Sequence, residues 1–371
     1  MYAENSYAEE SLLINVFIAG DSGQIGSELL KVLERQTESI SLQHGLHFSV
    51  SGKANTRGLY FHGRGFSPRK RGDWEVVAGR LAAGPSVFVD CSASEEVAAT
   101  YPHMLAQGIA VVTPNKLAFS GSFAQYHLLH ALSIEHDAPL LYNTTVGAAL
   151  PVIEPLKELA ARGEQPVRIE AVLSGTLSYL FARINQGATL SHAVREAWEL
   201  GYTEPHPARD LGGEDAARKL VILLRAAGYP IEPEEVAVEP MVPKGYLEEP
   251  DPARFVGSLA MLDRSWRARA ACGPLACIAR YANKRASVER VSVMPDSPFA
   301  RLEPRANLVQ VHTRHYDSLP LAISGPGAGV GITTAGVLSD LIEVGKRLRI
   351  REAPNRRNSA VSNNRVSELC G

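Results

Sequence analysis

Several carboxylates and one lysine gather in a short stretch, Gly201–Lys219, where they could transfer a proton. Asp215 and Lys219 are four residues apart, so they share one face of a helix. An apolar run follows at 220–224, and a lysine at the edge of such a run can be partly desolvated, which lowers the pKa of its amine toward the range useful for acid–base catalysis. The alternative is a surface ion pair that stabilises the helix by about 0.2–0.5 kcal/mol. The other motifs of the chain favour the catalytic interpretation.

A glycine-rich turn, Gly20–Gly26, stands between a predicted buried strand at 12–19 and a predicted helix at 23–35. Its spacing is G-x-x-G-x-x-G, which permits a tight turn and close approach of the backbone to a pyrophosphate at the helix N-terminus. Such glycines also make ordinary turns, so the spacing alone is weak evidence. The position between a strand and a helix strengthens the prediction of a dinucleotide site.

The end of the second predicted strand bears on the choice of cofactor. An NAD site usually places Asp or Glu there to bind the ribose 2′-hydroxyl. The segment 51–57 has no acid but contains Lys53 and Arg57, which would suit the 2′-phosphate of NADP. We therefore expect NADP, with NAD as the alternative cofactor; otherwise both cations simply face solvent.

Small residues follow the strand predicted at 86–90. Ser92, Ala93 and Ser94 leave room for the ribose and nicotinamide of a cofactor. Cys91 could instead be a nucleophile, but no histidine is placed by sequence context to activate it.

The order of the predicted elements indicates the fold. Strands and helices alternate to about residue 150, which predicts a parallel, doubly wound α/β sheet of the Rossmann type, and the pattern after Pro151 is typical of a second, α+β domain. We divide the chain into a dinucleotide-binding domain at 11–150 with a return segment at 320–348, a second domain at 151–319, and a disordered tail at 349–371. The remaining expected strands are 47–51, 109–113, 140–142, 167–173 and pieces within 288–311, and the expected helices are 95–107, 122–136, 151–162, 179–185, 193–200, 213–227 and 333–348.

Composition excludes several classes of function. The 371 residues are 45% hydrophobic with a formal net charge of −2, so there is no electrostatic case for binding nucleic acid or a membrane surface. The four cysteines are scattered, without a CxxC pair, which disfavours a metal site or a disulfide framework and fits a reducing cytoplasm. We expect no signal peptide, because the N-terminus lacks a basic-then-apolar pattern.

The motifs, taken in order, resemble those of one family. Thr113–Lys116, Thr145–Pro151, Leu173–Tyr179, Gly201–Lys219 and Gly325–Asp340 occur in the order seen in homoserine dehydrogenases. The resemblance runs from about Val16 to Leu348 and looks closest to the dehydrogenase portion of the bifunctional aspartokinase–homoserine dehydrogenases.

This resemblance implies a reversible reaction between L-aspartate 4-semialdehyde and L-homoserine with NAD(P)H, on the route to threonine and methionine, in a protein that is commonly a homodimer. It implies acid–base roles for Lys219 and Lys116, and roles for Glu204, Asp210 and Asp215 in holding the substrate amino group, its hydroxyl and the lysine. Gly175, Thr176 and Tyr202 would line the same pocket. The residues expected to contact the cofactor are Gly20, Gly23, Gln24, Ile25, Gly26, Lys53, Arg57, Ser92, Ala93, Ser94, Thr113 and Gly329.

The chain departs from the family pattern in three places. Family members usually carry Glu or Asp at the position of Asn143, where a monovalent cation binds; the amide oxygen of Asn143, with the carbonyls of Val146 and Ala148, would bind a cation more weakly. The glycine loop is one residue longer. We also expect no aspartokinase segment and no regulatory domain, hence no threonine feedback through such a module.

Two other functions compete with this reading. One is an NADP-dependent dehydrogenase of a different small amino or hydroxy acid, which a substrate panel would separate. The other is a catalytically silent nucleotide-binding protein, which predicts loss of the acid–base residues. The chain keeps Lys116, Glu204, Asp210, Asp215 and Lys219 together, which counts against the silent protein.

Overall fold

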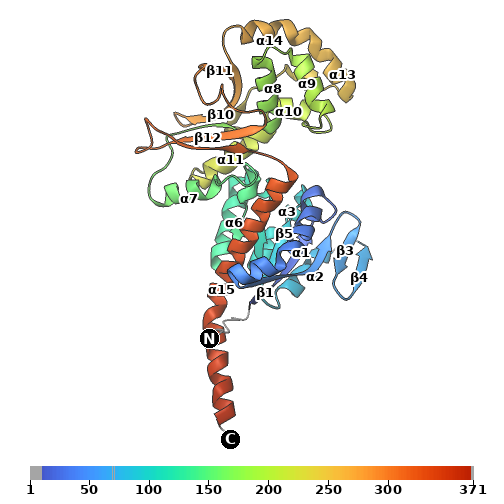
Figure 1. Cartoon of the computed structure of the whole chain (residues 1–371), viewed down its shortest axis with the longest axis vertical. Helices are drawn as coiled ribbons and strands as arrows, with labels where there is room; N and C mark the ends of the chain where they lie inside the picture. The colour runs from blue at the N-terminus through green and yellow to red at the C-terminus, as the bar shows by residue number, and fades with distance from the viewer. Residues whose placement is uncertain (1–10, 69, 71, 369–371) are drawn as a thin grey trace, which may run out of the picture. The chain divides into compact units, whose positions relative to one another are not determined.

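The computed structural model of the protein describes residues 11–68, 70 and 72–368, and for residues 353–368 it describes the backbone alone. The chain forms two compact units, each assembled from separate segments (Figure 1). The first unit contains the described residues up to Asn115, then His127–Tyr142 and the chain from Thr334 onward. The second unit contains Lys116–Tyr126 and Asn143–Thr333.

The first unit is built on a seven-stranded sheet with the order β4-β3-β2-β1-β5-β6-β7. Strands β2, β1, β5, β6 and β7 are parallel, which confirms the predicted doubly wound sheet, while β3 and β4 extend it as an antiparallel hairpin that the sequence did not reveal. The strand bounds are β1 Leu12–Ala19, β2 Leu46–Ala54, β3 Gly58–Phe61, β4 Gly65–Pro68, β5 Ser86–Asp90, β6 Ala110–Val112 and β7 Leu140–Leu141.

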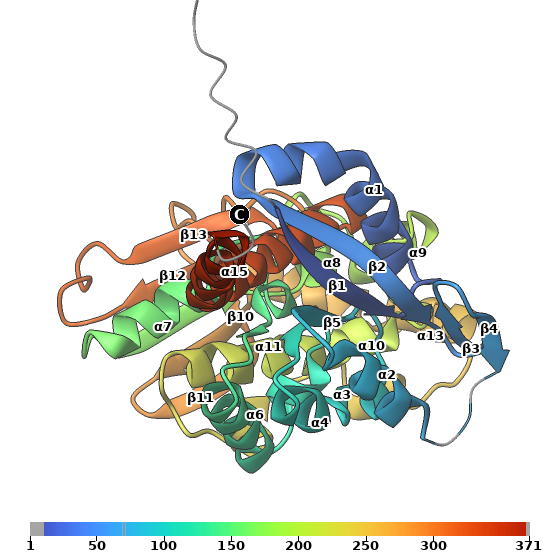
Figure 2. The same cartoon turned by 90° about the horizontal axis from the view of Figure 1, so that it is seen from below.

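Helices cover this sheet. Figure 2 shows α1 lying along β1 and β2. The predicted helix 95–107 is divided into α3 and α4, because the chain restarts with Pro102 in the first turn of α4, where a missing N–H costs nothing. The helix bounds are α1 Gln24–His44, α2 Asp73–Leu81, α3 Glu95–Ala98, α4 Tyr101–Ala106, α6 Phe123–Glu135, which begins in the second unit, and α15 Val330–Glu368.

The C-terminal helix α15 supplies part of the first unit's core. Val337, Leu341 and Val344 lie in one buried apolar cluster with residues of β1, α1 and β5. The sequence predicted a disordered tail from Arg349, whereas α15 continues to Glu368; the last three residues lie outside the described part. Arg349 donates to the His44 carbonyl and Arg351 to the Asp137 carbonyl, so contacts with the unit extend past the predicted end of the helix.

The second unit has a six-stranded sheet with the order β13-β12-β8-β10-β11-β9. Its pairs are antiparallel except for β11 with β9. The strands are β8 Arg168–Val172, β9 Val236–Val238, β10 Leu275–Ala282, β11 Arg285–Ser292, β12 Ala306–His312 and β13 Leu321–Pro326. The helices are α5 Leu117–Ser120, α7 Ile153–Ala161, α8 Gly175–Asn185, α9 Leu190–Glu199, α10 Ala208–Gly212, α11 Glu214–Ala226, α12 Lys244–Leu247, α13 Pro252–Ser258 and α14 Asp263–Ala270, with the 3₁₀ turns η1 Asn143–Thr145, η2 Pro233–Glu235 and η3 Leu259–Leu262.

Helix α8 begins earlier than the sequence predicted. The expected start was Tyr179, after a Ser-Gly-Thr turn, but Gly175 and Thr176 form the first turn of the helix. The reason is an N-cap: the Ser174 hydroxyl accepts a hydrogen bond from the Leu177 amide at 3.2 Å.

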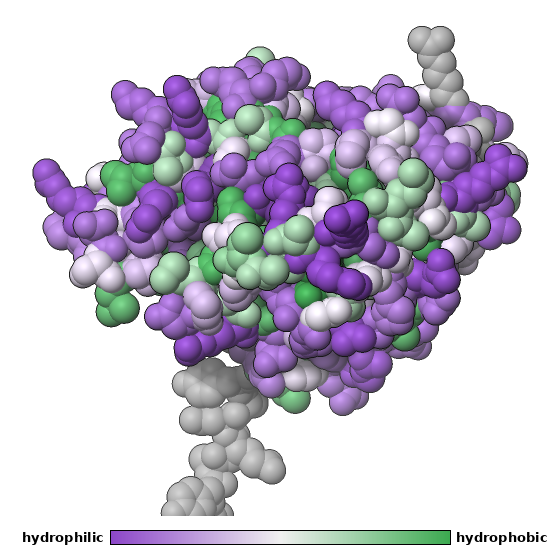
Figure 3. Space-filling model, turned by 90° about the horizontal axis from the view of Figure 1, so that it is seen from above, coloured by the Kyte–Doolittle hydropathy of each residue, from purple (hydrophilic) through white to green (hydrophobic). Residues whose placement is uncertain are grey.

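No helix in the described part of the chain combines the length and apolar character needed to cross a membrane. The face shown in Figure 3 is mostly hydrophilic, with apolar side chains in small separate groups.

Candidate active site

Two lysines meet on one carboxylate in the second unit. Asp215 lies in the first turn of α11. Its Oδ1 is 2.8 Å from the Nζ of Lys116, and its Oδ2 is 2.8 Å from the Nζ of Lys219, so the carboxylate forms an ion pair with each lysine. Lys219 comes from the next turn of α11, as the sequence predicted, whereas Lys116 immediately precedes α5 and is far away in the sequence. The fold therefore brings together the two lysines that were proposed for acid–base work.

The charges of this group are strongly coupled. Burial alone would raise the pKa of Asp215, but attraction from Lys219 and Lys116 holds that pKa well below its usual range. Burial lowers the pKa of Lys219, whose side chain is 12% exposed, and Lys116 lowers it further, while Asp215 opposes the shift. Lys219 is thus an amine whose proton is more labile than that of a surface lysine.

Lys219 is also fixed by a backbone group. Its ammonium donates to the Leu173 carbonyl at 2.7 Å, just before the N-cap of α8. Asn307 of β12, which is buried, donates to the same carbonyl at 3.4 Å. Sequence reasoning missed Asn307; the available signal was an amide side chain next to the apolar pair Leu308 and Val309 within a strand.

A second group of predicted residues lies around Tyr202. The Thr176 hydroxyl donates to the Tyr202 carbonyl at 2.7 Å, and the Glu204 amide donates to an Asp210 oxygen at 2.9 Å. Burial raises the pKa of Asp210, although hydrogen bonds from Glu204 and Thr176 partly oppose this. The side chain of Glu204 is exposed, as a group that meets a substrate ammonium must be.

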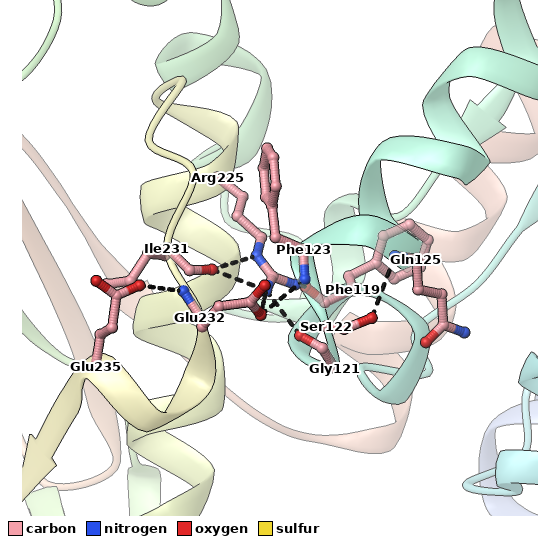
Figure 4. A network of polar contacts seen from close by, with 9 residues as sticks. All are labelled: Phe119, Gly121, Ser122, Phe123, Gln125, Arg225, Ile231, Glu232 and Glu235. Carbon is pink, nitrogen blue, oxygen red and sulfur yellow. Dashed lines mark hydrogen bonds and ion pairs between the residues drawn. The ribbon is translucent and has the colours of Figure 1, made fainter.

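The segment that carries Lys116 is held by a buried arginine (Figure 4). Arg225, near the end of α11, donates to the carbonyls of Phe119 and Gly121 at 2.7 Å each and to that of Ile231 at 2.9 Å. Its guanidinium also lies 3.6 Å from Glu232, whose carboxylate accepts from the Phe123 amide. Helix α11 therefore holds α5 and its flanks at two points, through Asp215 at one end and Arg225 at the other.

The glycine loop of the first unit fits a pyrophosphate. Gly20 has φ +82°, and a Cβ at Gly26 would lie 2.3 Å from the Gly20 carbonyl oxygen, so neither position accepts a side chain. Helix α1 starts at Gln24 and Ile25 with Gly23 as N-cap, no side-chain cap and no acid in its first turn. The free amides and the positive end of the helix dipole are suited to a phosphate group.

The predicted 2′-phosphate position contains an acid that the sequence argument missed. Lys53 lies 3.4 Å from Asp21, and Asn55 donates to the same carboxylate at 2.9 Å. Asp21 comes from the glycine loop rather than from the second strand, so a search for an acid at the strand end could not find it. Arg57 is exposed, with its amide bonded to the Asn55 side chain.

The turn after β5 is organised by a buried carboxylate. Asp90 accepts from the Ser92 amide, the Tyr101 hydroxyl and the Asn115 side chain. The remaining predicted residues lie around this carboxylate. The Ser94 hydroxyl caps α3, and the Ala93 side chain is exposed. The Thr113 hydroxyl donates to the Asp90 carbonyl, and Thr113 has no exposed surface. Because the whole residue is buried, Thr113 does not reach the surface where a cofactor would bind, contrary to the prediction; its hydroxyl fixes the backbone at Asp90 instead.

Cys91 does not have the properties of a nucleophile. Burial and the neighbouring Asp90 raise the pKa of its thiol far above the usual range, so the thiolate is scarce. Cys91, Cys272 and Cys277 are all free thiols; Cys370 lies outside the described residues.

The remaining predicted residues lie in the second unit. Gly329, with φ +138°, directly precedes α15. Asn143 begins η1, and Val146 and Ala148 follow, with Ala148 in the left-handed region at φ +55°. Within the described ranges no cluster of three or more His, Cys, Asp or Glu could hold a metal ion, and the cation site at Asn143, Val146 and Ala148 stays a prediction.

A dinucleotide-type sheet, together with two lysines on one carboxylate, defines a class: nicotinamide-dependent dehydrogenases of small hydroxy or amino acids. Comparison with known proteins identifies the family. The model for the homoserine dehydrogenase NAD-binding domain matches residues 22–143, and the homoserine dehydrogenase model matches residues 151–342. The chain belongs to the homoserine dehydrogenase family.

Individual relatives agree with this assignment. The chain is 33% identical to a homoserine dehydrogenase of Schizosaccharomyces pombe over 92% of this chain and 98% of the relative. It is also 33% identical to a bifunctional aspartokinase/homoserine dehydrogenase of Haemophilus influenzae, over 89% of this chain but only 42% of that longer protein. A mutant of a hyperthermophilic archaeal homoserine dehydrogenase, solved in complex with NADPH, has the same fold, with a TM-score of 0.70, 24% identity, and coverage of 90% of this chain and 98% of that one.

Proposed function

We propose that this protein catalyses the reversible reduction of L-aspartate 4-semialdehyde to L-homoserine with NADP, and that it acts in the synthesis of threonine and methionine. The observation that carries this proposal is the pair of lysines on Asp215, with Lys219 hydrogen-bonded to the Leu173 carbonyl. Family membership supplies the substrate, and the archaeal relative solved with NADPH supports the cofactor.

Lys219 is the proton donor and acceptor in this proposal. An ammonium has three N–H groups, and those of Lys219 that face Asp215 and Leu173 are occupied, which leaves one direction for the substrate oxygen. A reduced nicotinamide, when bound, would supply hydride to the aldehyde carbon. Lys219 would give its proton to the aldehyde oxygen, which becomes the hydroxyl of the product. In the reverse direction the neutral amine of Lys219 removes the hydroxyl proton.

The other residues orient the substrate. Lys116 lies beside the same carboxylate and adds positive charge near the developing alkoxide. The exposed carboxylate of Glu204 is assigned to the substrate ammonium, and Asp210 and Asp215 to the hydroxyl and to Lys219. Gly175, Thr176 and Tyr202 form the wall beside them.

The proposed function is tested by mixing the purified protein with NADP and L-homoserine at alkaline pH. The expected result is growth of the absorbance band of reduced nicotinamide, dependent on both reagents. A folded protein that gives no signal with either NADP or NAD would overturn the proposal.

The pH dependence of L-homoserine oxidation should report the pKa of Lys219. Because the neutral amine is required, kcat/KM rises with pH and reaches its plateau below the range of an ordinary lysine. The Asp215 carboxylate raises the pKa of Lys219, so Asp215→Asn should move the rising limb to lower pH even though it lowers the maximum rate. Glu196→Gln, which changes a carboxylate paired with Arg183 on α8, serves as the control. A limb that stays in place or moves to higher pH in Asp215→Asn would contradict the assignment.

The cofactor preference should depend on Lys53. Lys53→Ala is expected to lower kcat/KM with NADP about tenfold while leaving kcat/KM with NAD nearly unchanged, since only NADP carries the 2′-phosphate. The matched control is Lys31→Ala, an exposed lysine of α1 paired with Glu28. Equal losses with both cofactors, or none, would show that Lys53 merely neutralises Asp21.

Two further expectations belong to this proposal. We infer a homodimer, as is common in the family, which size-exclusion chromatography with light scattering would test. We also place the protein in the cytoplasm, a compartment compatible with free thiols at Cys91, Cys272 and Cys277.

A further inference from the structure

An arginine lies over the aromatic wall of the candidate site. The guanidinium carbon of Arg305 is 4.2 Å from the centre of the Tyr202 ring. The backbone of Arg305 lies against the start of α8, because a Cβ at Gly175 would be 3.5 Å from the Arg305 carbonyl oxygen. Thr176 joins the same group through its hydrogen bond to the Tyr202 carbonyl. Arg305 thus touches two of the residues assigned to the substrate pocket.

The backbone of Arg305 adopts a conformation that favours glycine. Its φ is +69°, in the left-handed region, where the backbone of residues other than Gly, Asn and Asp is strained. Strain of this kind often marks residues that serve a ligand site. The side chain at position 305 therefore needs a reason other than the turn that it occupies.

The charges of the site leave one requirement unmet. Lys116 and Lys219 both pair with Asp215, and the other charged residues of the group, Glu204 and Asp210, are acids. An amino acid substrate also carries an α-carboxylate, which needs a cation. Arg305 lines a surface groove together with Arg301 and Glu303. Within the described part of the chain, no carboxylate forms an ion pair with Arg305, not even that of Glu303.

We propose that Arg305 binds the α-carboxylate of the substrate, so that it determines specificity for α-amino acids over simple amino alcohols and aldehydes. The planar guanidinium offers two parallel N–H donors to a carboxylate, and stacking on Tyr202 holds it in place. Glu204 would then bind the ammonium of the zwitterionic substrate, and Arg305 its α-carboxylate. This inference rests on the proposed function.

The experiment compares wild type with Arg305→Gly and Arg305→Lys. Glycine relieves the backbone strain, so Arg305→Gly is expected to have a Tm at least equal to that of wild type while its KM for L-homoserine rises about tenfold or more. We expect kcat to change by less than about twofold and the KM for NADP to stay constant. Arg305→Lys keeps the positive charge but loses the two parallel N–H donors of the guanidinium, so its KM for L-homoserine should lie between those of wild type and Arg305→Gly.

Two controls separate this role from a general effect. Arg301→Ala removes another exposed arginine of the same groove and should leave the KM unchanged. L-homoserinamide lacks the α-carboxylate, so wild type and Arg305→Gly should handle it equally, whether it is measured as a substrate or as an inhibitor.

Three results would overturn the inference. The first is an unchanged KM for L-homoserine in Arg305→Gly, and the second is an equal weakening of L-homoserinamide binding in that variant. The third is a Tm of Arg305→Gly so far below that of wild type that partial unfolding explains the higher KM. A wild-type protein that does not oxidise L-homoserine would overturn the proposed function and this inference with it. An active wild type with an unaffected Arg305→Gly would overturn this inference alone.

Discussion

Replacing Lys219 with methionine is expected to lower kcat for L-homoserine oxidation by about 100- to 10,000-fold, the range typical of a lost general acid–base group. Methionine keeps most of the side-chain volume at this nearly buried position but cannot carry the proton. Because the glycine loop belongs to the first unit, the variant should still bind NADPH with wild-type affinity. Steady-state kinetics and a fluorescence titration with NADPH measure the two quantities.

Lys157→Met is the matched control for this change. Lys157 also lies on a helix of the second unit, pairs with Glu154 at 2.9 Å, and has no role in the site. Its kcat should equal that of wild type. A kcat near normal in Lys219→Met would refute the assignment of Lys219, and weak NADPH binding would show that the change acts through the fold instead.

The second large effect is expected at Arg225. Arg225→Met should lower the free energy of unfolding by about 3 kcal/mol or more, because the buried carbonyls of Phe119, Gly121 and Ile231 lose their donor. The amides of Phe119 and Ser120, which bond to the Lys116 carbonyl, should exchange with solvent faster, because α5 loses its support. Urea unfolding and hydrogen exchange test the two statements.

Arg195→Met provides the comparison, since Arg195 is an exposed arginine on α9 of the same unit and its loss should change stability by less than about 0.5 kcal/mol. If the two variants unfold at the same urea concentration, Arg225 does not support the fold in the way described.

Much of the first sheet could be predicted from local sequence. Strands β1 and β5 have the predicted bounds, because each is a short run of mainly apolar residues ending at a turn. The hairpin β3–β4 was missed because each of its strands is only four residues long and begins with glycine, and β4 is largely exposed. The early start of α8 was missed for a different reason: a serine cap places glycine and threonine, usually turn residues, inside a helix.

In the candidate site, contacts within one helix could be predicted from the sequence, whereas contacts between elements far apart in the sequence could not. The pairing of Asp215 with Lys219 follows from a spacing of four residues on a helix. The approach of Lys116 to Asp215 could be expected only through the family resemblance, because no local pattern joins α5 to α11. Asp21 and Arg225 had no such guide: their partners Lys53 and Phe119 come from other elements of the fold.

The bond between Arg225 and the Phe119 carbonyl has a consequence during synthesis. Its two residues are 106 positions apart, and a ribosome adds about 5–20 residues per second. The end of α5 therefore emerges roughly 5 to 20 s before the arginine that completes it. During that interval β7, the last strand of the first sheet, is also synthesised, while α5 still lacks its contacts with α11. The ion pair between Lys116 and Asp215 can therefore form only after every strand of the first sheet has been synthesised.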